Sequence, residues 1–113
     1  MKHLKLIINN QEKKISNFFN KEELQTILNL YAYMVSNGEW KDYGLNISKT
    51  EVSFNVYKRA SEFPVYRIAK KLNPKYKNGT YIIKDSLGNI LKSSENLKKL
   101  IQDMKREKLK LVN

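Results

Sequence analysis

Residues 38–68 read GEWKDYGLNISKTEVSFNVYKRASEFPVYRI, and this stretch decides the fold. Apolar and polar residues alternate over residues 43–47 and again over residues 52–56. Alternation with a period of two is typical of strands that bury one face. The polar residues 48–51 lie between the two patterns, so the sequence predicts an antiparallel hairpin here.

A helix is predicted just before this hairpin. Asn20 is a favourable N-cap and Glu23, three residues later, completes a capping box. Gly38 is suited to the left-handed position that ends many helices. The apolar residues between them recur at helical spacing: Leu24, Ile27, Leu28, Tyr31, Met34 and Val35.

Three further strands and a second helix are predicted after the hairpin. The strands are expected at residues 65–69, 80–85 and 90–91, separated by turn signals that contain Asn, Pro and Gly. Ser94 is expected to cap a final helix that carries Leu97, Leu100, Ile101 and Met104 on one side. The expected fold class is therefore α+β: an antiparallel β-meander of about five strands packed against an N-terminal and a C-terminal helix in a two-layer sandwich.

The length of 113 residues predicts a single domain, residues 1–113. Residues 1–17 are expected to form a short strand or hairpin, and residues 106–113 a basic tail. The apolar run near the N-terminus is short, so we expect no signal peptide, no membrane span and a cytoplasmic location.

The composition argues against the common kinds of catalytic and metal site. The chain has no cysteine, and its one histidine, His3, lies near the terminus. Its four glycines are isolated and form no phosphate-binding loop. We therefore expect no catalytic residue, no metal and no cofactor, and a protein that is not an enzyme.

The net charge of +11 favours an anionic partner. Residues 58–84 contain one acid, Glu62, and eight bases with tyrosines among them. These bases are the candidate anion-binding or nucleic-acid-binding residues: Lys58, Arg59, Arg67, Lys70, Lys71, Lys75, Lys77 and Lys84. Four of the lysines, at 70, 71, 75 and 77, are expected to form a loop between two strands. The alternative is that an AT-rich genome produced the lysine excess.

Arg59 and Arg67 stand out because the chain otherwise uses lysine, with only three arginines in all. A guanidinium group can bind a phosphate or a carboxylate through two parallel hydrogen bonds. One hypothesis is an anion site. The other, which we favour from the sequence, is a pair of structural salt bridges to acids at positions 39, 42 or 62.

Trp40 and Tyr43 provide a second hypothesis about partners. Trp40 follows the glycine that ends the first helix, so we expect its ring to be at least half buried between that helix and the sheet. Tryptophan and tyrosine are also favoured anchors of protein interfaces. The alternative function is therefore a protein–protein adaptor or a homodimer that uses the Trp40–Tyr43 aromatic surface.

Several strings together resemble a known family. They are FNKEEL at 19–24, GEWKDY at 38–43, FNVYKRASEFPVYRI at 54–68 and GTYIIKDSLGNILK at 79–92. They resemble a small alphaproteobacterial family, domain of unknown function 2794, over about residues 18–105. The chain has lysine at positions 41 and 58, where that family often has arginine. The resemblance implies a cytoplasmic single-domain protein and supplies no reaction, cofactor or ligand.

Together these patterns predict a small, basic, non-enzymatic binding or regulatory module. RNA, or a ribonucleoprotein, is the expected partner ahead of other polyanions.

Overall fold

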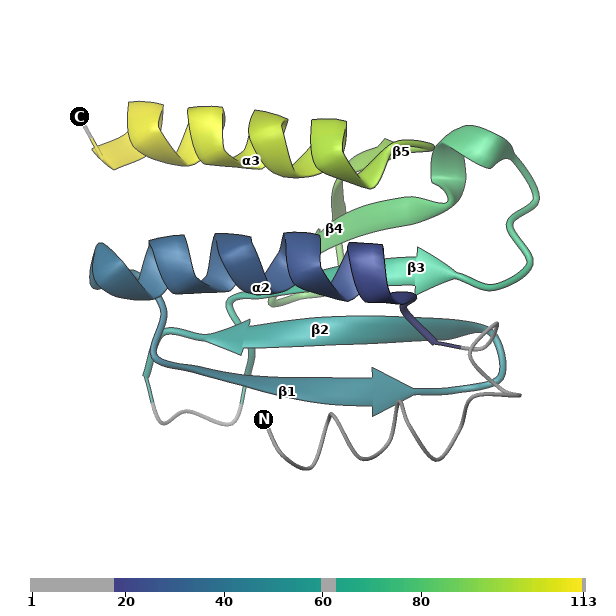
Figure 1. Ribbon diagram of the computed structural model, residues 1–113, viewed down its shortest axis with the longest axis horizontal. Coiled ribbons are helices and arrows are strands. Elements are labelled where there is room, and N and C mark those ends of the chain that lie inside the picture. Colours follow the sequence, from purple (N-terminus) through teal and green to yellow (C-terminus); the bar gives the residue numbers. More distant parts are fainter. Residues whose placement is uncertain (1–17, 60–62, 113) are drawn as a thin grey trace.

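The computed structural model describes residues 18–59 and 63–112, with side chains as far as Glu107. Within them, five antiparallel strands form one sheet in the order β1-β2-β3-β4-β5, and two α-helices lie against it (Figure 1). The elements are α2 (Lys21–Ser36), β1 (Asp42–Ile47), β2 (Glu51–Tyr57), β3 (Tyr66–Lys71), the short 3-10 helix η2 (Lys77–Gly79), β4 (Tyr81–Asp85), β5 (Ile90–Ser94) and α3 (Leu97–Val112). The predicted α+β fold is confirmed.

The capping box predicted for α2 is present. The Glu23 backbone N–H donates to Asn20 Oδ1 at 2.8 Å, and the Asn20 N–H donates to Glu23 Oε1 at 2.7 Å. At the other end, Gly38 has a φ of +74°, the left-handed conformation that favours glycine. Local chemistry therefore sets both ends of this helix.

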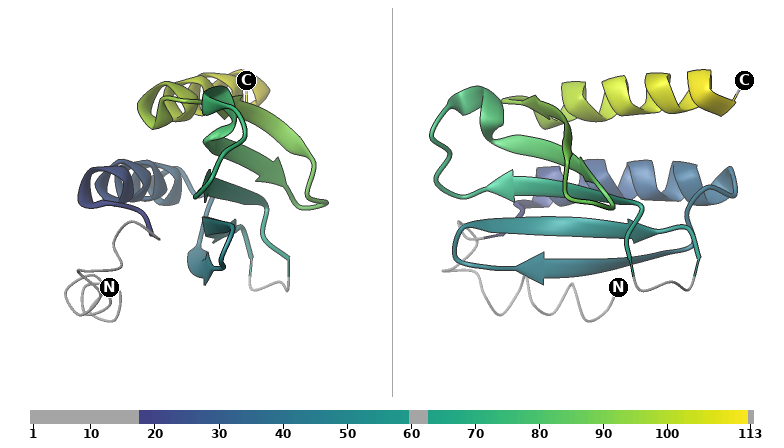
Figure 2. Two further views of the ribbon diagram at one scale, coloured as in Figure 1. Left: turned by 90° about the vertical axis from the view of Figure 1, so that its right-hand side faces the viewer. Right: turned by 180° about the vertical axis from the view of Figure 1, so that it is seen from behind.

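The two helices cover the same face of the sheet, which gives a two-layer molecule (Figure 2). Alternate strand residues point toward the helices, and Phe54, Ile68 and Ile83 lie side by side in one such row. These three side chains are buried and pack with apolar residues of both helices. The largest buried side chain in this core is Trp40, at 1% exposed, which confirms the prediction that it is buried.

Four boundaries differ from the sequence predictions by two residues or more, and one of them is the end of β5, which lies at Ser94 and not at residue 91. Strand β3 continues to Lys71, two residues further than expected. Helix α3 begins at Leu97, and its cap is Asn96, whose Oδ1 accepts from the Lys99 N–H; Ser94 ends β5 instead. The helix then continues to Val112, so residues 106–112 are its last turns and not a separate tail. The strand or hairpin expected at 1–17 lies outside the described residues.

The other face of the sheet carries polar side chains of β2, β3 and β4. Both described helices lie on the opposite side, so neither of them covers it (Figure 2). We call it the open face. None of the described helices is long and apolar enough to span a bilayer.

Candidate functional site

The centre of the open face carries a row of polar side chains on three neighbouring strands. Arg67 on β3 is paired in register with Asn55 on β2 and with Lys84 on β4. Neighbouring strands lie about 5 Å apart, so the row is about 10 Å across. We call these three residues the central row. It brings together two of the predicted basic residues and one amide that the sequence analysis did not select.

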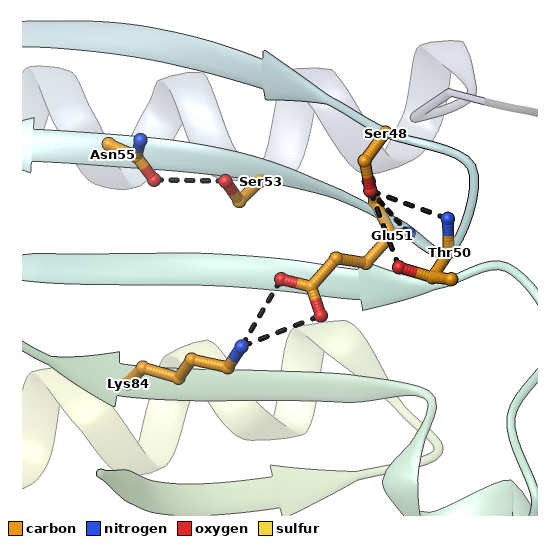
Figure 3. Close-up of polar contacts among 6 residues, drawn as sticks. All are labelled: Ser48, Thr50, Glu51, Ser53, Asn55 and Lys84. Atoms are coloured by element: carbon orange, nitrogen blue, oxygen red, sulfur yellow. Dashed lines mark hydrogen bonds and ion pairs between the residues drawn. The ribbon is translucent and has the colours of Figure 1, made fainter. Parts of the chain in front are cut away.

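Asn55 is held in one orientation by its neighbour on the same strand. The Ser53 hydroxyl donates to Asn55 Oδ1 at 3.0 Å (Figure 3). Ser53 is 4% exposed, so this hydrogen bond is partly shielded from solvent. Because the amide oxygen is occupied, the Asn55 NH₂ group is left to donate beside Arg67.

Lys84 forms an ion pair that crosses β3. Its Nζ lies 3.2 Å from Glu51 Oε2 and 3.4 Å from Oε1 (Figure 3). Both side chains are partly exposed, at 21% and 25%. The pair runs diagonally from β4 to β2, and Ala69 on the intervening strand is fully buried. Lys84 is therefore occupied in part by a protein carboxylate.

The turn that carries Glu51 is fixed by Ser48. The Ser48 hydroxyl oxygen accepts from the backbone N–H of Glu51 at 3.1 Å and of Thr50 at 3.3 Å, and the hydroxyl donates to the Glu51 carbonyl at 2.8 Å (Figure 3). A hydroxyl that satisfies the groups of a tight turn restricts its backbone. The position of the Glu51 carboxylate therefore follows from the geometry of the β1–β2 hairpin.

Arg67 has no acidic partner in the part of the chain that the structure describes. Among residues 18–59 and 63–107, no ion pair joins Arg59 or Arg67 to Asp42, and Glu62 lies outside the described residues. The Nε atom of Arg67 is buried without a hydrogen-bond partner. A buried donor without a partner is costly. The favoured structural hypothesis therefore loses its support for Arg67.

Lys70 is the one predicted binding residue that lies on the helix-covered face. Its Nζ donates to Glu23 Oε1 at 2.8 Å and to the Phe18 carbonyl at 3.2 Å. Glu23 is 7% exposed, so this is a largely buried ion pair that joins β3 to the start of α2. The prediction that Lys70 belongs to a basic loop is therefore wrong, because a carboxylate far away in the sequence binds its ammonium group inside the fold.

The same carboxylate also binds a tyrosine. The Tyr81 hydroxyl on β4 donates to Glu23 Oε2. Burial, followed by this hydrogen bond and by the negative charge of Glu23, raises the pKa of the Tyr81 hydroxyl well above its ordinary value of 10. The Glu23–Lys70–Tyr81 cluster therefore ties α2 to two strands.

The other predicted basic residues lie at the surface. Lys58 and Arg59 follow β2, Lys71 ends β3, and Lys75 and Lys77 lie in the β3–β4 connection, all exposed. Of the four lysines expected in one loop, only those at 75 and 77 are in it. The ammonium group of Lys75 lies 5.8 Å from the ring centre of Tyr76.

The rings proposed as an interface do not form a surface. Trp40 is 1% exposed, and its ring centre lies 6.4 Å from those of Tyr31 and Tyr66. Tyr43 is partly buried and stacks on Phe54 with ring centres 4.7 Å apart. The ring of Trp40 therefore belongs to the core and is not available to a partner.

A cavity of about 550 Å³ lies between α3 and strands β3–β5, away from the central row. Its charged lining residues are Asp85, Lys92 and Glu107, of which the last two are paired at 3.0 Å. The backbone N–H of Asn89 donates to Asp85 and is the main cause of a lowered pKa of its carboxyl group. An acidic lining does not favour an anion.

Sequence reasoning missed Asn55 of the central row and the two residues that contact the row, Ser53 and Glu51. Serine and asparagine in a strand carry little signal on their own. Residues two apart in a strand share a face, so Ser53 and Asn55 lie on the same side of β2. Which base on another strand they meet depends on a register that only the folded sheet defines.

Comparison of the sequence with models of known protein families identifies the family of this chain. Residues 17–101 match the model of the family described as Protein of unknown function (DUF2794). The chain belongs to this family. The match confirms the resemblance seen in the sequence, and its bounds are close to the expected 18–105. No curated protein and no solved structure gives a match.

Proposed function

We propose that this DUF2794 protein is a non-enzymatic binding module for an anionic partner, with RNA as the first candidate, and that the ligand binds on the open face of the sheet. The observation that carries the proposal is the placement of Arg67. It lies between Asn55 and Lys84 in the middle of this face, without an acidic partner in the described chain.

The chemistry of the central row suits a phosphate group. A guanidinium group offers a planar pair of donors that matches two phosphate oxygens. The Asn55 amide adds a neutral donor on one side, oriented by Ser53. Lys84 lies on the other side, and a phosphate would compete with Glu51 for its ammonium group. Three donors of different kinds would therefore converge on one anion.

The surrounding charge supports a chain of phosphates more than a single anion. Among the eight predicted bases, only Lys70 and Lys84 have an ion pair in the described structure. The exposed bases lie at both ends of β3, beyond the central row. Contacts of this kind bind the backbone of a nucleic acid without reading its sequence.

The test is binding of a fluorescein-labelled single-stranded RNA to wild type and to Arg67→Gln, followed by anisotropy at several salt concentrations. We expect affinity to fall about tenfold at low salt, as for loss of a hydrogen-bonded charge pair. The slope of log affinity against log salt should become shallower by about 0.7. Arg67→Lys should lose most of the affinity as well, because it keeps the charge without the planar pair of donors.

Arg106→Gln is the matched control. It removes the same charge from an exposed arginine on α3 that pairs with Asp103. Equal losses for Arg67→Gln and Arg106→Gln would show that net charge alone attracts the RNA. The absence of saturable binding to wild type at low salt would reject the proposal.

A protein partner or homodimer is the second candidate, and one observation favours it. Three apolar side chains near the β4–β5 turn are strongly exposed: Leu87 at 84%, Ile90 at 59% and Leu91 at 49%. Exposed apolar groups of this kind mark many interaction surfaces. Sedimentation of wild type and of Leu87→Asp would test it, and a wild type that is monomeric at high concentration would reject the homodimer.

A further inference from the structure

The open face also carries an aromatic ring beside the central row. Tyr57 ends β2, two residues after Asn55, and points to the same side of the sheet. Because Arg67 is paired with Asn55, Tyr57 and Arg67 are diagonal neighbours, with backbones about 7–8 Å apart. A ligand held by Arg67 is therefore within reach of this ring.

The absence of a side chain at Gly44 shapes the position of the ring. Gly44 on β1 is the register partner of Asn55. A Cβ atom added to Gly44 would lie 3.8 Å from Cε1 and 4.0 Å from the hydroxyl oxygen of Tyr57. The ring therefore lies close to the Cβ position of Gly44 on β1, so in the row of register partners it is separated from Arg67 by Asn55. Tyr57 remains partly exposed.

From this placement we infer that the ligand is single-stranded, and that one base stacks on Tyr57 while the adjoining phosphate binds Arg67. The inference rests on the proposed function and specifies its ligand. A flat ring beside a cationic row is how proteins hold single strands without strong sequence preference. The bases of a duplex are stacked on one another and cannot reach such a ring.

Other basic side chains lie where they could contact further phosphates of the same RNA strand. Lys58 and Arg59 come directly after Tyr57 in the chain, and Lys71 lies at the far end of β3. All three are exposed and have no ion pair in the described structure. The six residues of β3 span about 20 Å, which is long enough for a short run of nucleotides to lie along it.

The experiment compares two ligands of equal charge: a 10-residue oligouridylate and an abasic oligonucleotide of the same length. Tyr57→Leu should weaken binding of the oligouridylate about five- to hundredfold, the range for loss of one stacked base. It should leave the affinity for the abasic ligand almost unchanged. Tyr57→Phe keeps the ring and should retain the affinity for both, provided that each variant shows a cooperative thermal transition.

Tyr76→Leu is the matched control, since Tyr76 is exposed in the basic β3–β4 connection. If Tyr57→Leu binds both ligands as wild type does while Arg67→Gln weakens both, stacking is excluded and the phosphate site stands. If Tyr76→Leu alone reduces oligouridylate binding, the platform is in the wrong place. A duplex that binds wild type as tightly as the oligouridylate would overturn the inference. If neither ligand binds wild type, the proposed function itself fails.

Discussion

At the scale of single residues, Trp40 and Arg67 show what local sequence can and cannot predict. The burial of Trp40 follows from its place between a helix-ending glycine and a strand, which are neighbours in the chain. The neighbours of Arg67 in the sheet could not be predicted in the same way. Three acids were within plausible reach, and the sheet register places Arg67 between Asn55 and Lys84 instead.

Replacement of Trp40 by alanine should destabilise the fold by about 3–5 kcal/mol, because it leaves a large cavity in the core. Trp40→Phe should cost less. It retains much of the ring and removes an indole N–H that is buried without a hydrogen-bond partner. Urea unfolding followed by far-ultraviolet circular dichroism would measure both variants. A Trp40→Ala variant with the wild-type midpoint would contradict the core placement.

At the scale of elements, the sequence predicted well those features that depend on near neighbours. Both ends of α2 were predicted from residues within one or two turns. The extent of β3 was not, because the density of lysines after residue 69 predicts a charged loop there. Lys70 lies within the strand, and its buried charge is compensated by the carboxylate of Glu23, which lies on α2. A buried ion pair between distant residues leaves no local pattern.

The Glu23–Lys70–Tyr81 cluster should make stability depend on alkaline pH. The pKa of Tyr81 is higher in the folded state than in the unfolded chain, where it is about 10. Its contribution is therefore fully present below about pH 10 and is lost as the pH rises through the folded value. Tyr81→Phe should lack this part of the decline.

Chemical unfolding between pH 8 and the highest pH at which the fold persists would test the dependence, with wild type and Tyr81→Phe side by side. Tyr76→Phe is the control, because Tyr76 is 67% exposed. All other ionisable groups are common to the wild type and Tyr81→Phe, so only the difference between curves is informative. Parallel curves for wild type and Tyr81→Phe would mean that the cluster does not hold the phenol in its neutral form.

At the scale of the whole molecule, the question is whether the charge of +11 has a function. The sequence shows how many bases there are, but their placement requires the fold. In the structure, Lys70 is largely buried in an ion pair with Glu23. Lys71 ends β3, and Lys75 and Lys77 lie in the connection that follows it. A purely genomic bias would make every exposed lysine equivalent for ligand binding. A functional surface would not, and this difference can be measured.

Two triple variants with the same loss of charge separate these explanations. In the first, Lys71, Lys75 and Lys77 are changed to glutamine. In the second, three exposed lysines of the helical layer are changed: Lys21, Lys98 and Lys99.

If the strand of RNA runs past β3, the first variant should flatten the slope of log affinity against log salt by up to about 2, at roughly 0.7 for each lost phosphate contact. The second should change it little, because those lysines belong to the two helices, which cover the opposite face of the sheet (Figure 2). Both variants should keep the wild-type melting temperature within a few degrees, since all six side chains are exposed. Equal slopes for the two variants would assign the attraction to net charge, and with it the lysine excess to composition.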